Sequence, residues 1–257
     1  MVNALLAEDF KPYIARNRQT GGFTFDMWIA DPVAEEWYGG ERSHDLPECV
    51  WLFSHIRAGM KVVDCGAHHG FLTIPFSKAV GPTGVVEAWE ALLANAAVIN
   101  QNLVLNGCHN ALVHPYALGD ERKIVRLWTH TSNCLVPWQD PHYGNDEVQM
   151  VRLDEQIPIH VKVDLIKIDV EGSDLQMMRG ARRVLSERPI IDLELHCFLF
   201  ENRNDVIAEI FSILEPLNYA YSVLPRPDGA VLATHGNINL TELAQYQNPH
   251  VFCLPMW

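Results

Sequence analysis

One stretch of the chain combines an acid and two glycines at a spacing that suits a ligand site. It is Lys61 to Gly70, K-V-V-D-C-G-A-H-H-G. Two β-branched apolar residues near its start favour a buried strand that ends at Asp64. Gly66 and Gly70 then predict a tight turn into a helix, which brings backbone N–H groups and a helix N-terminus close to a ligand. The same letters are also compatible with an ordinary strand–loop–helix joint.

The spacing of this turn indicates which ligand it would take. D-x-G-x-x-x-G differs from the G-x-G-x-x-G of dinucleotide enzymes. An acid just before the turn repels a pyrophosphate but suits a ligand with ammonium and sulfonium groups, such as S-adenosylmethionine. Glu90 follows Gly70 by about 20 residues, the distance at which doubly wound folds place the acid that binds ribose hydroxyls. A carboxylate accepts both protons of a diol, although Glu90 can also be read as a solvated acid at a helix start.

Two further polar pairs follow predicted strands. Asp169 and Glu171 are two residues apart at the end of one strand, and Glu194 and His196 are two apart at the end of the next. Because neighbouring parallel strands end at one edge of a sheet, we expect these side chains to form a polar centre.

This polar centre could have one of three chemical functions, or it could have a purely structural role. Asp169, Glu194 and His196 could bind a divalent cation. His196 or Asp169 could act as general base towards a substrate hydroxyl, with His196 the better placed by its ordinary pKa. The carboxylates could also hold the ammonium end of a cofactor. The structural reading is a salt-bridged network with Lys167 or Arg179.

The elements that must position these residues alternate along the chain. The hydrophobic pattern predicts strands at 61–65, 85–90, 110–118, 163–170 and 189–195, and helices at 47–57, 71–80, 91–106, 173–187 and 201–214. It also predicts strands at 123–129 and 147–153, a late antiparallel pair at 219–224 and 250–254, and a helical turn at 241–246. The prediction is therefore an α/β, Rossmann-like, doubly wound and mostly parallel sheet with a late antiparallel strand.

Two regions flank this pattern. Residues 1–45 are aromatic and irregular, with a short strand after 23, and predict an N-terminal cap on a main domain at 46–257. The loop at 128–145 is long enough to be functional. Six aromatic residues of the two regions could stack on a sugar or pack in the core: Trp28, Trp37, Tyr38, Trp128, Trp138 and Tyr143.

Composition narrows the class of protein. A net charge of −13 over 257 residues repels phosphate backbones, which argues against nucleic acid as a partner. The six cysteines include no C-x-x-C pair, which favours reduced thiols and a cytoplasmic protein. The pattern shows no signal peptide and no membrane span, and it leaves a homo-oligomer open.

The ordered set of motifs resembles the FkbM-type methyltransferases, a branch of the class I S-adenosylmethionine-dependent enzymes. The blocks are V-V-D-C-G-A-H-H-G at 62–70, A-W-E-A at 88–91, A-L-G-D at 117–120, D-L-I-K-I-D-V-E-G-S-D at 164–174 and R-P-I-I-D-L-E-L-H at 188–196. The chain differs from the family pattern at His68, where Asn is usual, at Ala91, where Pro is usual, and at Asp174, where Glu is usual.

The resemblance implies a class I methyltransferase fold that binds S-adenosylmethionine. It implies cofactor contacts from Asp64, Gly66, Ala67, His68, Gly70, Glu90, Tyr116, Ala117 and Asp169. It points to O-methylation of a small molecule or a sugar unit of a glycan. A non-catalytic cofactor-binding protein and an NAD-linked oxidoreductase are the alternatives, the second disfavoured by the missing G-x-G-x-x-G.

Overall fold

A central sheet of eight strands organises the molecule, in the order β13-β12-β14-β11-β10-β3-β4-β5. The computed structural model describes residues 10–40, 46–130, 133–135, 146–227, 229–233 and 238–256. The parallel strands are β3 (Lys61–Cys65), β4 (Val85–Trp89), β5 (Ala111–His114), β10 (Leu165–Ile168) and β11 (Ile190–Glu194). The remaining strands are β12 (Tyr219–Leu224), β13 (Leu232–Ala233) and β14 (His250–Pro255). β14 runs antiparallel to β11 and β12, so the predicted parallel sheet with a late antiparallel strand is confirmed.

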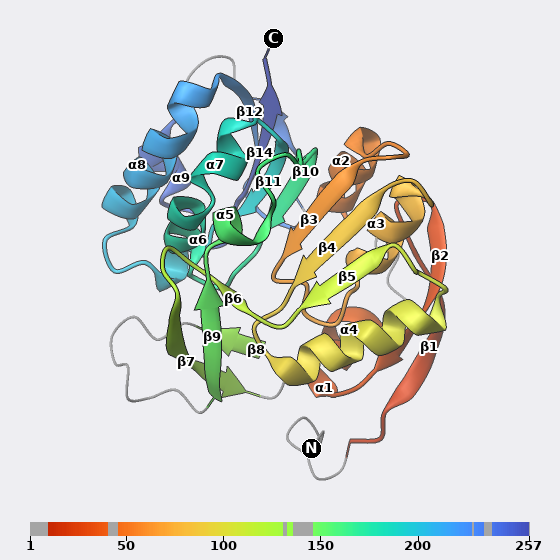
Figure 1. The fold of residues 1–257 in the computed structure, drawn as a ribbon. Coiled ribbons are helices and arrows are strands. Elements are labelled where there is room, and N and C mark those ends of the chain that lie inside the picture. The colour runs from red at the N-terminus through yellow and green to blue at the C-terminus, as the bar shows by residue number, and fades with distance from the viewer. Residues whose placement is uncertain are drawn as a thin grey trace.

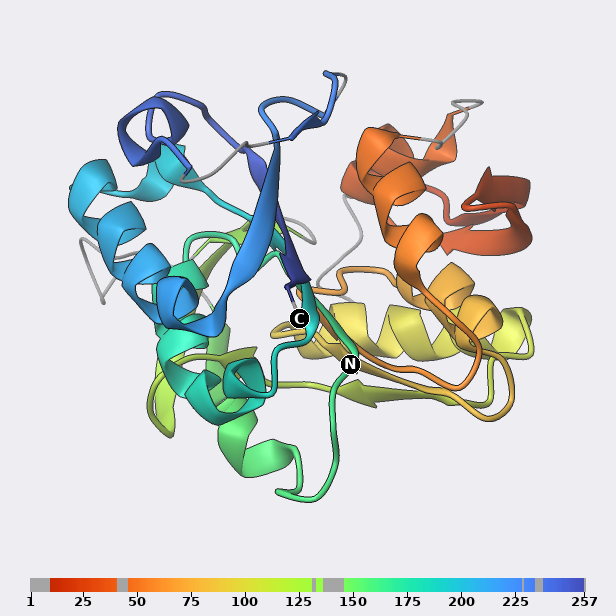
Figure 2. The same cartoon turned by 90° about the horizontal axis from the view of Figure 1, so that it is seen from above.

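Helices cover both faces of this sheet (Figures 1 and 2). One face carries α2 (Pro47–His55), α3 (Thr73–Val80) and α4 (Leu93–Leu105). The other carries α5 (Leu153–Gln156), α6 (Asp174–Gly180), α7 (Arg182–Ser186), α8 (Arg203–Leu214) and α9 (Leu240–Leu243). A strand that is covered on both faces needs apolar side chains on both. In β3, Val62 packs on the side of α2 and α3, and Val63 packs on the side of α6, α7 and α8.

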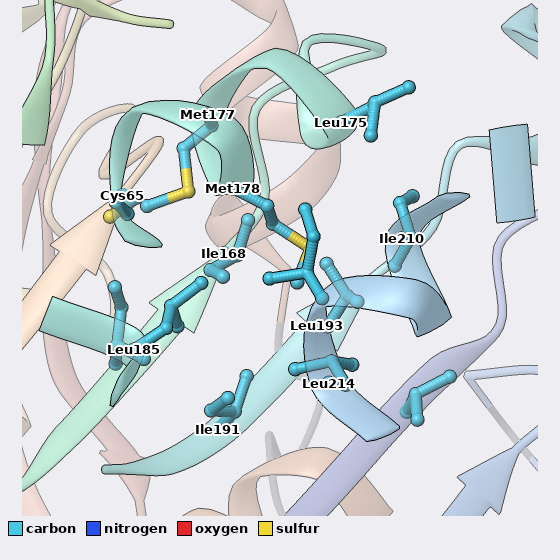
Figure 3. Close-up of a cluster of buried hydrophobic side chains, with 14 of the residues drawn as sticks. Cys65, Ile168, Leu175, Met177, Met178, Leu185, Ile191, Leu193, Ile210 and Leu214 are labelled. Carbon is cyan, nitrogen blue, oxygen red and sulfur yellow. The ribbon is translucent and has the colours of Figure 1, made fainter. Parts of the chain in front are cut away.

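The larger core cluster lies under α6, α7 and α8 (Figure 3). Ile168 and Leu193 from the sheet meet Met177 and Met178 of α6, and each is fully buried. Burial of side chains this size stabilises the fold by about 1.5–3 kcal/mol apiece. This side of the sheet is therefore a rigid support for the polar strand ends on the opposite side.

Two predicted elements are divided in the structure. The strand expected at 110–118 becomes β5 and β6 (Ala117–Leu118), because Pro115 between them has no N–H to continue a ladder. The helix expected at 173–187 becomes α6 and α7. At the break, Gly180 approaches the backbone of Gly119 so closely that a Cβ on Gly180 would lie 1.8 Å from the Gly119 oxygen.

A second sheet extends from the end of β5 in the order β6-β9-β7-β8. It contains β7 (Lys123–His130), β8 (Asn133–Leu135) and β9 (Asp146–Val151). Most of the long loop expected at 128–145 lies outside the described residues.

The N-terminal segment begins with a hairpin of β1 (Tyr13–Thr20) and β2 (Phe23–Ile29), followed by α1 (Pro32–Ala34) and the π-helix η1 (Glu35–Gly39). The sequence analysis found the strand after 23 but not β1. The side-chain amides of Asn102 in α4 and of Asn106, the residue that caps its C-terminus, bind β2. Asn102 Oδ1 accepts the N–H of Trp28 at 2.7 Å, and Asn106 Oδ1 accepts the N–H of Asp26 at 3.0 Å. Two side chains four residues apart thus accept N–H groups of β2 that a neighbouring strand would otherwise bind.

Short 3₁₀ turns complete the described chain, η2 (Cys197–Leu199) and η3 (Glu215–Leu217). Within the described ranges, none of the helices has the length and apolar character needed to cross a bilayer.

Candidate active site

Gly66 lets the end of β3 approach the end of β10. Its φ is +83°, and a Cβ there would lie 1.6 Å from the carbonyl oxygen of Asp169. Only glycine fits, because both the backbone angle and the space exclude a side chain. Gly70, with φ +84°, instead faces Ile99 of α4, whose Cγ2 would lie 3.2 Å from an added Cβ. The two predicted glycines are therefore both required, one at the site and one for packing.

The turn differs from our expectation in how its backbone N–H groups are used. Those of Gly66 and Ala67 donate to the carbonyl of Trp89 at 2.9 and 3.0 Å. That of His68 donates to Glu90 Oε2 at 2.9 Å, and that of Gly70 donates to the carbonyl of Ala67 at 2.7 Å. These four donors are already engaged inside the protein. The turn therefore does not offer these N–H groups to a phosphate. This agrees with Asp64 at its start, because an acid there would repel a phosphate.

Glu90 is buried beside the turn and held by three donors. Besides His68 N–H, its carboxylate accepts the N–H of Leu92 at 2.9 Å and lies 3.3 Å from Asn95 Nδ2. Burial raises the pKa of Glu90 to about 7, although these hydrogen bonds oppose the rise. Asp64 is also buried and accepts the hydroxyl of Thr73 at 2.6 Å.

A single cavity of about 410 Å³ joins the turn to the polar strand ends. Eight of the nine residues predicted to contact a cofactor line it: Asp64, Gly66, Ala67, His68, Glu90, Tyr116, Ala117 and Asp169. Gly70 is not on its wall. Glu194 lines the cavity, whereas His196 does not.

The charged strand residues form two rows on the sheet face covered by α2. In the first row, Lys167 is paired in register with Asp64 on one side and Asp192 on the other. In the second row, Glu194 is paired with His250 of β14. Alternation along a strand puts residues two apart on one face, so Asp192 and Glu194 both face α2.

Lys167 is the buried cation of this face. Its Nζ donates to Asp169 Oδ2 at 2.7 Å, which is one of the salt bridges that the sequence allowed. The other, through Arg179, does not form, because Arg179 pairs with Glu209 and Asp120. Burial alone raises the pKa of Asp169, but the cations Lys167 and His196 outweigh burial and hold that pKa below its ordinary value.

His196 lies behind the cavity wall among three carboxylates. Its Nε2 is 3.6 Å from Asp169 Oδ1 and 3.4 Å from Glu171 Oε2, and its Nδ1 is 3.6 Å from Asp174 Oδ1. Burial lowers the pKa of His196, but Asp174 and its acidic neighbours dominate and raise it to about 10. The acids around His196 therefore favour its imidazolium form.

Glu171 and Glu194 both line the cavity, but only Glu171 is grouped with His196 and Asp169. Glu171 lines the cavity with φ +48°, a rare angle for a residue other than glycine. Burial, followed by repulsion from Asp169, raises the pKa of Glu171 to about 7. The ligand atoms of Asp169, Glu171 and His196 lie within 4.8 Å of one another, whereas Glu194 Oε2 lies 3.8 Å from His250 Nε2. The geometry thus gathers Glu171, in place of the predicted Glu194, around His196.

The N-terminal segment covers the turn. Tyr38 of η1 shares a hydrogen bond of 3.1 Å with His68 Nδ1 and stacks on Phe71 with ring centroids 5.0 Å apart. Trp37 and Tyr38 line the cavity, whereas Trp28 does not and Trp128 is exposed on the second sheet. The predicted aromatic residues Trp138 and Tyr143 lie outside the described part of the chain.

Comparison with known proteins assigns the family. The sequence model of the methyltransferase FkbM domain matches residues 64–222, more than half of the chain. The chain belongs to the FkbM methyltransferase family. No curated protein matches it.

Solved structures that are similar to this FkbM family member include three methyltransferase-related proteins. Methyltransferase FkbM from Methylobacillus flagellatus KT is 20% identical with a TM-score of 0.50, over 76% of this chain and 44% of that one. The chain therefore spans less than half the length of that relative. A SAM-dependent methyltransferase from Aquifex aeolicus is 16% identical with a TM-score of 0.44, over 87% and 93% of the two chains. Fibrillarin from Aeropyrum pernix, with natively bound S-adenosyl-L-methionine, is 11% identical with a TM-score of 0.46, over 78% and 68%.

The cavity of this FkbM protein fits the chemistry of S-adenosylmethionine. Glu90 presents a carboxylate for a ribose diol, and Tyr116 and Ala117 offer a largely apolar wall for a base. Asp64 and Asp169 add two further carboxyl groups to the cavity wall. The engaged N–H groups of the turn leave little there for a phosphate.

Three residues of the wall or its support were not predicted from the sequence: Glu48, Asp192 and His250. Glu48 lines the cavity from α2, and the other two lie behind it. No local sequence pattern marks these three residues clearly. Asp192 is a single acid in the apolar strand P-I-I-D-L-E-L, and Glu48 and His250 lie far from it along the chain.

Proposed function

We propose that this protein transfers the methyl group of S-adenosylmethionine to a hydroxyl of a small molecule or of a sugar unit in a glycan. One observation carries the proposal. A single cavity connects Glu90 and the glycine turn, where an adenosyl group would lie, with the carboxylates of Asp169 and Glu171. Binding and proton transfer can therefore occur in one continuous cavity.

Four residues would hold the cofactor in this proposal. Glu90 accepts the ribose hydroxyls, Tyr116 and Ala117 flank the adenine, and Asp169 lies near the methionine end. When bound, S-adenosylmethionine supplies a methyl group that is already activated by its positive sulfur. The protein's main task is then to align an acceptor oxygen, an effect of about 7–11 kcal/mol when the geometry is right.

The acceptor's proton must leave as its oxygen bonds to the methyl carbon and the carbon–sulfur bond breaks. We expected His196 or Asp169 to take it. In the proposal a cavity-facing carboxylate, Asp169 or Glu171, accepts the proton, and the His196 imidazolium behind them is a positioning residue. A positioned base adds about 10²–10⁴-fold in rate. A cation at Asp169, Glu194 and His196 stays a prediction, whereas the ligand atoms that lie together in the structure are those of Asp169, Glu171 and His196.

The experiment measures binding and transfer separately. Titration calorimetry should show that S-adenosylhomocysteine binds and NAD does not. The protein is then incubated with methyl-labelled S-adenosylmethionine and a panel of sugars, polyols and phenols, and product is sought by mass spectrometry. Binding of NAD instead would overturn the proposal in favour of an oxidoreductase. Cofactor binding without transfer to any acceptor would favour a non-catalytic protein.

A further inference from the structure

His250 is fully enclosed on the sheet face beneath α2, among side chains from three elements. Asp192 and Glu194 come from β11 and Lys167 from β10, while Glu48 comes from the first turn of α2, just after Pro47. His250 and Asp192 are 4% and 0% exposed in their side chains. His250, Asp192 and Glu48 are not among the residues proposed to hold the cofactor.

The two ring nitrogens of His250 have different surroundings. Nδ1 lies 2.9 Å from Asp192 Oδ1, a hydrogen bond that fixes the ring and puts a proton on Nδ1. Nε2 lies 3.9 Å from Glu48 Oε2 and 3.8 Å from Glu194 Oε2. A histidine that gives one nitrogen to a buried carboxylate and presents the other to acidic oxygens has the usual arrangement of a metal ligand with its supporting carboxylate.

The carboxylates around His250 also have unused acceptor capacity. Within the described chain, Asp192 Oδ2 and Glu48 Oε1 are buried and make no hydrogen bond. Ligand atoms of Glu48, Asp192 and His250 lie within 4.8 Å of one another. Orphaned oxygens of this kind are costly unless something binds them, since an unpaired buried acceptor costs about 1–3 kcal/mol.

Carboxyl groups outnumber basic groups around His250. Asp192, Glu48 and Glu194 surround its ring, and the nearby buried Lys167 already bonds Asp169. Buried charges are ordinarily paired or bound to metal.

We propose that a divalent transition-metal ion binds between Glu48, Glu194 and His250 Nε2, with Asp192 holding the ring through Nδ1–H. Metal–ligand bonds of about 2.1 Å put neighbouring ligands of a tetrahedral ion about 3.4 Å apart. The two separations from His250 Nε2, 3.9 Å to Glu48 Oε2 and 3.8 Å to Glu194 Oε2, therefore need to shorten by about half an ångström, and the two carboxylates must also move towards each other. An imidazole with carboxylates favours Mn²⁺, Fe²⁺ or Zn²⁺ over Ca²⁺. Because Glu48 and Glu194 line the cavity, the ion would face the acceptor side.

The test uses Mn²⁺ as the probe and requires no methyl transfer. Chelator-treated protein is titrated with Mn²⁺, and free ion is measured by its six-line electron paramagnetic resonance spectrum. Wild type should bind Mn²⁺ and unfold at a higher temperature with it. Glu48→Gln and His250→Gln should each bind one ion fewer per chain. Spin-echo modulation from a directly bound imidazole nitrogen should be lost in His250→Gln.

Glu171→Gln is the matched control, because Glu171 belongs to the separate group around His196. It should retain the ion at His250, even if a second ion at His196 is lost. Circular dichroism checks that each neutral replacement keeps the fold. Wild type that binds no Mn²⁺ at millimolar concentration, or Glu48→Gln that titrates like wild type, would show that His250 is an imidazolium counter-ion only. Since neither cofactor nor acceptor is present, this outcome is distinct from a failure of the proposed methyl transfer.

Discussion

The backbone N–H of His68 donates to Glu90 Oε2 over 2.9 Å, which ties the glycine turn after β3 to the carboxylate after β4. The bond holds two candidate cofactor contacts together before any ligand arrives. Leu92 N–H binds the other oxygen of the same carboxylate, so Glu90 can turn little. A fixed acceptor loses less freedom when a ribose binds, which favours affinity.

Glu90→Ala should weaken binding of S-adenosylhomocysteine by about 10–100-fold, because hydrogen bonds to a charged acceptor contribute about 1.5–3 kcal/mol. Glu87→Gln is the control, since Glu87 lies on the same strand but pairs with Lys61 and His114. Titration calorimetry on both variants gives the comparison. Unchanged affinity in Glu90→Ala would refute the ribose role.

The affinity for S-adenosylhomocysteine should depend on pH through Glu90, whose pKa burial raises to about 7. The ionised carboxylate is the better acceptor, so binding should tighten from pH 6 to pH 8. The ligand-free protein shows the opposite trend. Its folded state holds a proton that the unfolded state releases near 4.5, so this group's contribution to stability falls as pH rises towards 7.

Glu90→Gln should remove the contribution of this carboxyl from both pH profiles, so that the rise in affinity from pH 6 to pH 8 becomes smaller. Calorimetry at pH 6, 7 and 8 measures the affinity, and urea unfolding at the same pH values measures the stability. A variant whose affinity keeps the wild-type pH dependence would assign the titration to another group.

The sequence predicted the sheet and the turn because both depend on local pattern, and it failed where contacts are distant. Apolar β-branched runs located β3, β10 and β11, and Gly66 marked the close approach to Asp169. The pairing of Glu194 with His196 rested on strand alternation, but β11 ends at Glu194 and His196 has left the strand, with φ −84° and ψ 62°. Glu194 meets His250 instead, through a pairing with β14 that no local pattern encodes.

Gly66→Ala should abolish folding or cofactor binding, because the new Cβ would lie 1.6 Å from a backbone oxygen that cannot turn away. Gly22→Ala is the matched control. Gly22 has a similar φ of +79° but nothing within 4 Å of an added Cβ, so it isolates the backbone cost of about 1–2 kcal/mol. Thermal unfolding and the yield of folded protein distinguish the two. Equal losses in both variants would mean that the approach to Asp169 is unimportant.

His68→Asn should preserve the fold, although it restores the residue usual in the family. His68 has φ +49°, which Asn tolerates and a β-branched residue does not. His68→Val should therefore lose about 1–3 kcal/mol of stability. Tyr38→Phe removes the hydroxyl that meets His68 but keeps the ring stacked on Phe71. Calorimetry measures cofactor binding in both variants. Equal weakening in His68→Asn and Tyr38→Phe would mean that the hydrogen bond between Tyr38 and His68 supports cofactor binding.

The hairpin should depend on the side-chain amides of Asn102 and Asn106, which bind β2. Asn102 also donates to the carbonyl of His69 at 2.9 Å, and Asn106 donates to the carbonyl of Asp26 at 2.6 Å. Asn102→Ala or Asn106→Ala leaves backbone groups of β2 unpaired, at about 1–3 kcal/mol each. Asn100→Ala, on the exposed side of α4, should change stability by less than about 0.5 kcal/mol.

Urea unfolding of the three variants and of Asn102→Ala/Asn106→Ala measures these costs. The double variant should lose less than the sum of the single losses, because one broken contact already frees the strand that the other holds. Hydrogen exchange should then show β1 and β2 opening before the central sheet. Losses in Asn102→Ala no larger than in Asn100→Ala would mean that the hairpin is held by its apolar contacts alone, through Phe25, Met27 and Ile29.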